Sequence, residues 1–68
     1  MIGEYGYLQL GDEDPVLYQV HLRLGVFPAG TKFGKELEQR VRGLQYLHGL
    51  PVDGCVDDDV LSILDIKE

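Results

Sequence analysis

Residues 44–64, L-Q-Y-L-H-G-L-P-V-D-G-C-V-D-D-D-V-L-S-I-L, decide the fold of this chain. The stretch begins as the end of a helix, because Gly49 can adopt the positive φ that helix ends favour and the proline two residues on prevents the helix from resuming. Asp53 and Gly54 then predict a tight turn, in which Gly54 is left-handed and the Asp53 carboxylate accepts backbone N–H groups. The acids at 57–59 suit the unpaired N–H groups and positive dipole end of a following helix.

Two more helices are predicted upstream. Asp14 followed by Pro15 favours a helix start, so the first helix should run from about 15 to 24 and end at Gly25. The second helix should span roughly 35–48, and Gly43 inside it costs about 1 kcal/mol relative to alanine, which predicts a close approach by another element. The third helix should be short, about 58–64. Apolar spacing predicts inward positions at Leu17, Val20 and Leu24, then Leu37, Val41, Leu44 and His48 with Leu47 adjacent, then Val60, Leu61 and Leu64.

The remaining segments are an N-terminal arm and a loop. Residues 2–10, I-G-E-Y-G-Y-L-Q-L, combine aromatic and aliphatic types with two glycines, which favours an extended arm over a helix. Tyr5 and Tyr7 would share one side of that arm, as candidate protein contacts or as a cover for the core. In the loop at 25–34, Phe27 and Phe33 are expected to anchor the loop to the core. We therefore expect an arm at 1–10 and a single three-helix domain at 11–66.

Composition limits the classes of function. The 68 residues make one domain, which buries only about 60% of the surface of its unfolded form. Six basic and twelve acidic residues give a net charge of −6, which argues against nucleic acid and against anionic membranes as partners. Cys55 is the only cysteine, so no disulfide forms within the chain. The N-terminal region lacks the basic and apolar regions of a signal peptide, and no stretch approaches the length of a membrane span.

The sequence offers little for catalysis. Cys55 would need a histidine within hydrogen-bond reach, and His48 lies seven residues earlier across the turn, but both fit turn and helix-end positions better. His21, His48, Cys55 and the acids at 57–59 lack any known metal-ligand spacing, and the acids fail the calcium-loop pattern. We therefore expect no enzyme activity, no metal and no cofactor.

An internal repeat appears when the chain is shifted by 26 residues, which lays Tyr18-Gln19 on Leu44-Gln45. Each copy contains a helix, a glycine, a bend and the next helix, and the helix ends correspond with one or two residues of slippage. Two half-repeats that share the middle helix make a three-helix domain.

These features resemble the peptidoglycan-binding-like domain family, small three-helix modules usually fused to cell-wall hydrolases. The second half of the family pattern is V-x-x-F-Q-x-x-x-G-L-x-V-D-G-x-V-G-x-x-T-x-x-x-L. The positions that match it in register are Val41, Leu44, Gln45, Gly49, Leu50, Pro51, Val52, Asp53, Gly54, Val56 and Leu64. Leu44 stands for the aromatic residue, Asp57 for the glycine and Val60 for the threonine. In the first half, the positions that fit are Tyr18, Gln19, Leu22, Leu24, Gly25, Phe33 and Gly34, whereas Ala29-Gly30 replaces the usual D-G and Leu37 replaces threonine.

The resemblance implies an all-α, small three-helix peptidoglycan-binding-like module with an extended N-terminal arm, acting as a non-catalytic binding module. It implies a ligand surface between the end of the second helix and the following turn, for which the candidate residues are Gln45, Tyr46, His48, Asp53 and Gly54. Their alternative role is support of the turn. The expected partner is peptidoglycan or another protein subunit, and the localisation stays open between the cell wall and a virion.

The alternative function is a bacteriophage virion structural protein, a minor capsid or decoration protein, that uses this fold for protein–protein assembly. Three features favour it: the chain carries no attached enzyme, it is acidic, and several family positions in the first half are lost. Since the wall is itself an anionic matrix, a domain at −6 gains no electrostatic steering toward it.

Overall fold

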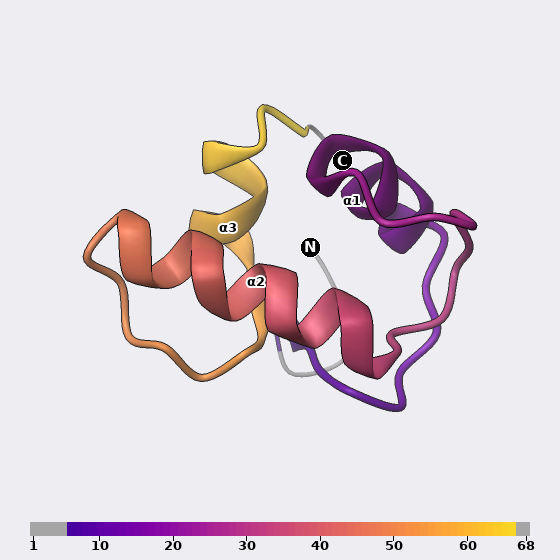
Figure 1. Cartoon of the computed structure of the whole chain (residues 1–68), viewed down its shortest axis with the longest axis horizontal. Helices are drawn as coiled ribbons and strands as arrows, with labels where there is room; N and C mark the ends of the chain where they lie inside the picture. The colour runs from indigo at the N-terminus through magenta and orange to yellow at the C-terminus, as the bar shows by residue number, and fades with distance from the viewer. Residues whose placement is uncertain (1–5, 67–68) are drawn as a thin grey trace.

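The computed structural model describes residues 6–66, which form three helices and one small sheet (Figure 1). In chain order the elements are β1 (Tyr7–Leu8), α1 (Val16–Leu24), α2 (Lys35–Leu47), β2 (Val56–Asp57) and α3 (Asp58–Ile63). The helix α2 crosses the molecule and packs against both α1 and α3. The predicted three-helix fold is confirmed, and the short sheet is an addition to it.

Aspartates begin two of the helices, as predicted. At α1, the Asp14 Oδ1 accepts a hydrogen bond of 2.9 Å from the Val16 N–H. At α3, the Asp57 Oδ1 accepts one of 3.0 Å from the Val60 N–H. Each carboxylate satisfies a backbone donor that has no partner within its helix.

All three helices end in the same motif. A residue in the left-handed conformation follows the helix, and the next N–H donates back to a carbonyl of the last turn, at 2.9 Å in each case. The left-handed residues are Gly25 (φ 71°), Gly49 (φ 70°) and Asp65 (φ 59°). The matching donor–acceptor pairs are Val26 to His21, Leu50 to Gln45 and Ile66 to Leu61.

These helix ends set the structural register of the repeat. Gly25 and Gly49 are 24 residues apart (49 − 25), so His21 is the counterpart of Gln45. His21 and Gln45 are the two buried polar side chains of the described region, whereas Gln19 is exposed. The shift of 26 inferred from the Tyr-Gln and Leu-Gln pairs is therefore two residues too long at the helix ends.

The core lies between the three helices and the sheet. Its buried members are Leu8, Leu17, Val20, Val26, Phe33, Leu37, Val41, Val56, Val60 and Leu61, and Leu24, Leu44 and Leu64 pack partly against it.

Four expectations about individual positions were wrong. Phe27 is 64% exposed and does not anchor the loop to the core, while Phe33 is buried as expected. At the end of α2, Leu47 and His48 face solvent, because the helix turns Gln45 inward instead. A Cβ on Gly43 would meet no atom of another described element within 4 Å, so no element of residues 6–66 crosses close to it.

The segment predicted as an arm is paired with the rest of the domain where the structure describes it. Tyr7 lies opposite Asp57 and Leu8 opposite Val56 in an antiparallel pair. Leu8 is 4% exposed and belongs to the core. Tyr5 lies outside the described residues.

A second connection joins the two loops that precede α1 and α2. The Gly11 N–H donates to the Phe33 carbonyl at 3.0 Å, and the Phe33 N–H donates to Asp12 at 2.9 Å. The Thr31 hydroxyl also donates to the Glu13 carboxylate at 3.1 Å. These bonds fix the entry to α2, the helix that carries the candidate site at its other end.

Candidate functional site

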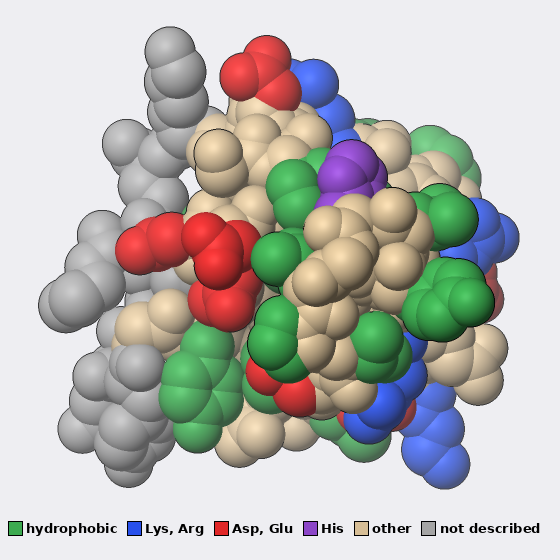
Figure 2. Space-filling view, turned by 90° about the vertical axis from the view of Figure 1, so that its left-hand side faces the viewer, with side chains coloured by type: hydrophobic (Ala, Val, Ile, Leu, Met, Phe, Trp, Pro, Cys, Tyr) green, Lys and Arg blue, Asp and Glu red, His purple; other side chains and the backbone are tan. Residues whose placement is uncertain are grey.

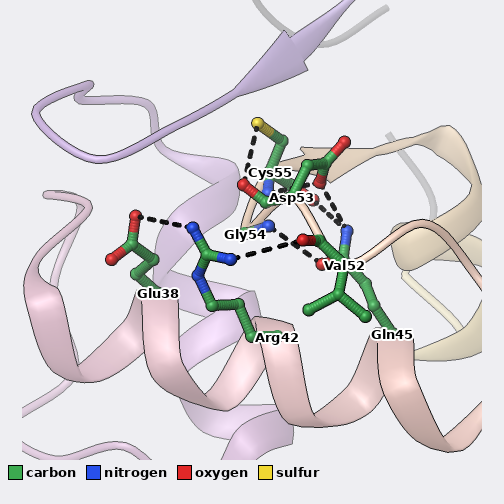
Figure 3. Close-up of polar contacts among 7 residues, drawn as sticks. All are labelled: Glu38, Arg42, Gln45, Val52, Asp53, Gly54 and Cys55. Atoms are coloured by element: carbon green, nitrogen blue, oxygen red, sulfur yellow. Dashed lines mark hydrogen bonds and ion pairs between the residues drawn. The ribbon is translucent and has the colours of Figure 1, made fainter.

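The candidate site is built around the buried amide of Gln45, which is only 2% exposed (Figure 3). Its Oε1 accepts the Gly54 N–H at 3.0 Å. Its Nε2 donates to the Asp53 Oδ1 at 2.8 Å and to the Cys55 carbonyl at 3.0 Å. One side chain of α2 thus satisfies three groups of the turn at 53–55, and it uses both amide hydrogens to do so.

The Asp53 carboxylate has a second internal donor. Its Oδ1 also accepts the Cys55 N–H at 2.9 Å. This backbone bond, followed by the bond from Gln45, lowers the pKa of Asp53 from its ordinary value of 3.8. Asp53 is therefore ionised at neutral pH, and its charge is held in a fixed position at the turn.

The side chains of α2 also approach the outside of this turn (Figure 3). The Arg42 Nη1 donates to the Val52 carbonyl at 3.3 Å, and the Arg42 Nη2 lies 3.9 Å from the Glu38 Oε2. Gly54 has φ +75°, and a Cβ there would meet the Glu38 Cγ at 3.0 Å and the Arg42 Nε at 3.1 Å. Glycine suits this position because of its positive φ, and an added Cβ would also require the Glu38 and Arg42 side chains to shift by a few tenths of an ångström.

The five candidate residues divide into two groups. Gln45, Asp53 and Gly54 are joined by the hydrogen bonds of the turn, with Gln45 and Gly54 buried and Asp53 at the surface. Tyr46 and His48 lie beside them in the chain with exposed side chains, Tyr46 being 78% exposed. Figure 2 looks at this end of the molecule, where apolar side chains gather beside a histidine and acidic side chains lie on one flank.

The turn also borders a pocket of about 420 Å³ that sequence analysis did not predict. Its lining residues are Gly6, Tyr7, Gln9, Asp53, Cys55 and Asp57. The sequence contained one signal for it, since a turn at 53–55 followed by the apolar Val56 suits a short strand that could pair with the Tyr7–Leu8 segment. Without knowledge of that pairing, Tyr7 and Asp57 could not be placed together.

The thiol of Cys55 is not arranged as a nucleophile. Its Sγ lies 3.8 Å from the Asp53 carbonyl oxygen, and no hydrogen bond within residues 6–66 joins it to His48. Burial raises the pKa of the Cys55 thiol, and the charges of Asp53 and Asp57 raise it further. The thiolate needed for attack is therefore disfavoured.

The described part of the chain also lacks a metal-binding cluster and a membrane-spanning helix. Among residues 6–66, no three histidine, cysteine, aspartate or glutamate side chains are grouped so that they could hold a metal ion. No helix in this part of the chain has the length and apolar character needed to cross a bilayer.

Comparison with protein families identifies the domain. Residues 4–64 match the family described as a putative peptidoglycan binding domain. The chain belongs to this family. The match covers nearly the whole sequence and includes both half-repeats, so the predicted resemblance is confirmed. No curated protein matches the chain significantly.

Two solved structures share the fold of this peptidoglycan-binding domain. One is a fused Zn-dependent amidase/peptidase/peptidoglycan-binding domain-containing protein from Clostridium acetobutylicum ATCC 824, with a TM-score of 0.80 and 26% identity over 91% of this chain. This chain spans 30% of that protein. The other is the SleB N-terminal domain, with a TM-score of 0.74 and 23% identity over 87% of this chain and 88% of that one.

Proposed function

We propose that this domain is a non-catalytic module that binds peptidoglycan through the surface at the end of α2. In this proposal Tyr46, His48 and Asp53 contact the ligand, while Gln45 and Gly54 hold the turn in place. The family match over residues 4–64 carries the proposal, because it covers the turn and both elements beside it.

The geometry supports separate roles for the two groups. Gln45 is buried and its amide is fully used by the turn, so it acts as a positioning residue for Asp53. Tyr46 supplies an exposed ring that can lie against the apolar face of a sugar, and His48 supplies a polar ring next to it. Asp53 supplies a fixed carboxylate that accepts hydrogen bonds from hydroxyl or amino groups.

A co-sedimentation assay with purified insoluble peptidoglycan tests the proposal. We expect the domain to sediment with the walls at physiological salt and to be released when a muramidase digests them. Tyr46→Ala should weaken retention several-fold, since the ring is exposed and its loss leaves the core intact. Tyr18→Ala is the matched control, because Tyr18 is 47% exposed on α1, away from the turn. Absence of retention for the unmodified domain would refute the proposal.

The alternative of a bacteriophage virion protein stays a prediction. None of the family and structure matches names a virion component. Tyr7, proposed from the sequence as a protein contact, is 36% exposed and pairs with Asp57 in the sheet. Any protein contact made through Tyr7 would therefore lie at the two-stranded sheet formed by β1 and β2.

A further inference from the structure

The end of α2 continues into an uncharged stretch with exposed apolar side chains. Residues 46–52, Y-L-H-G-L-P-V, contain no aspartate, glutamate, lysine or arginine, although the 68-residue chain has six basic and twelve acidic residues. Leu47 is 79% exposed, and Tyr46, Pro51 and Val52 are exposed as well. Figure 2 shows apolar side chains gathered beside the histidine at this end of the molecule. Exposed apolar side chains that gather in one place are typical of an interaction surface, whereas single ones are common everywhere.

This stretch is fixed by hydrogen bonds to α2. The Leu50 N–H donates to the Gln45 carbonyl at 2.9 Å, which closes the end of the helix. The Arg42 Nη1 donates to the Val52 carbonyl at 3.3 Å, which ties the following turn back to the same helix. The apolar side chains are therefore presented by a backbone that is already ordered, so a ligand that binds them has little order to impose.

The same surface offers little to an anionic ligand. Proteins bind carboxylates through cations or through N–H donors. Arg42 already donates to the Val52 carbonyl, and its Nη2 lies 3.9 Å from the Glu38 Oε2. Six N–H groups of the loop are also bonded inside the domain, and they belong to His48, Gly49, Leu50, Asp53, Gly54 and Cys55. Because the net charge of −6 also repels anions, this surface suits an uncharged ligand.

We infer that residues 46–52 bind the glycan strand of peptidoglycan, through its N-acetylated sugars, and not the stem peptides. The inference rests on the proposed function and names the part of the polymer that is bound. An N-acetylated sugar carries no charge, and it presents a ring face of C–H groups and the methyl of its acetyl group. The exposed ring of Tyr46 suits the sugar face, and the aliphatic side chains of Leu47 and Val52 suit the methyl.

A stem peptide has the opposite character, because its free end is a carboxylate. Binding it would place an anion on an acidic domain at a surface whose donors are already used. Binding the glycan avoids this cost. It also explains how a domain with a net charge of −6 can bind an anionic wall, since the contact is made with the uncharged part of the wall.

Soluble ligands test the inference directly. The tetramer of N-acetylglucosamine and the tripeptide of L-alanine, γ-linked D-glutamate and L-lysine are titrated separately, while the amide resonances of Tyr46, Leu47 and Val52 are followed by NMR. We expect the sugar tetramer to shift these resonances and the tripeptide to leave them unchanged. Shifts with the tripeptide alone, or with neither ligand, would overturn the inference.

Salt gives a second criterion. Because the tetramer is uncharged, its affinity should stay the same between about 0.05 and 0.5 M salt. An affinity that falls steeply over this range would show that the contact is ionic, and the glycan assignment would be wrong.

The wall assay separates this inference from the proposed function. If the domain sediments with walls and the tetramer causes no shift, the glycan assignment is overturned and the proposed function stands. If the domain does not sediment with walls, the proposed function fails, and the inference that rests on it fails too.

A matched pair of variants ties the binding to this surface. Leu47→Ser removes an exposed aliphatic side chain and leaves the core intact, so the variant should unfold at the same urea concentration as the unmodified domain. Its affinity for the tetramer should fall about fivefold, the loss expected for a partly covered aliphatic contact. Leu22→Ser is the control, because Leu22 is also exposed but lies on α1. The surface assignment is wrong if Leu47→Ser binds as tightly as the unmodified domain, or if both variants lose affinity equally.

Discussion

Replacing Gln45 with leucine should remove most of the stability of this domain. The change keeps the side chain about the same size and deletes three hydrogen bonds, one of them to a carboxylate. A bond to a charged group contributes about 1.5–3 kcal/mol and a neutral one about 0.5–1.5 kcal/mol. Because burial of leucine offsets part of this loss, we expect the free energy of unfolding to fall by about 3 kcal/mol.

A fall of that size is large for this chain, since a core of this length rarely supplies more than about 3–5 kcal/mol. Urea unfolding followed by circular dichroism at the helical band measures it, and the variant should begin to unfold with little or no urea. Gln39→Leu is the control on the exposed side of the same helix, and its effect should stay within about 0.5 kcal/mol. A loss below about 1 kcal/mol for Gln45→Leu would refute the view that its amide holds the turn.

Three further predictions concern the same turn and helix. Gly54→Ala should destabilise the domain by more than Gly49→Ala in urea unfolding, because both positions have positive φ but only Gly54 has neighbours within 4 Å of an added Cβ; equal losses would exclude a steric role. Gly43→Ala should raise the free energy of unfolding by about 0.5–1 kcal/mol, because its Cβ would meet no atom and alanine is the better helix former; a loss would reveal a close neighbour. Since the folded pKa of Asp53 is lowered below 3.8, its stabilising contribution is present above that pH and is lost as pH falls through the folded pKa. On acidification below about pH 4, the Asp53→Asn variant should therefore lose less stability than the unmodified domain in the same assay. If both proteins lose the same stability with falling pH, this sign is wrong.

The helices could be predicted because their ends are encoded locally. Asp14, Gly25, Gly49 and Asp57 each fix a helix end by a contact with a backbone group a few residues away, and all four positions were identified from the sequence. The turn at Asp53 and Gly54 was predicted in the same way, from the local chemistry of that dipeptide. Features that depend on neighbours in the chain are the ones that a single sequence expresses most directly.

The errors came from contacts between distant segments. Apolar spacing placed Leu47 and His48 on the core face of α2, yet Gln45 is turned inward there because the turn at 53–55 supplies partners for its amide. From the sequence, Gln45 was a candidate ligand residue with support of the turn as its alternative role, and the structure shows it bonded to the turn. A buried amide is stable only when its donors and acceptors are all satisfied, and no local pattern shows that they are.

The pocket was missed for the same reason. It exists because Tyr7 pairs with Asp57 across about fifty residues of chain. A two-residue strand is too short to give an alternation that the sequence can reveal. Tyr7 was chosen as a contact residue, but its position beside Asp53 follows only from the sheet.

The bonds that stabilise the turn also set the position of the proposed ligand contacts, so folding and binding should be linked. Any ligand that binds only the folded state stabilises it, by about 2.7 kcal/mol at a hundred times its dissociation constant. That gain is comparable to the expected cost of Gln45→Leu, so saturating soluble ligand should restore much of the helical signal of this variant. Restoration would require that the turn still forms its ligand surface when the amide is absent. If ligand stabilises the unmodified domain but not this variant, then Gln45 is needed to build the surface itself, and its role as a positioning residue for Asp53 is supported over a role in stability alone.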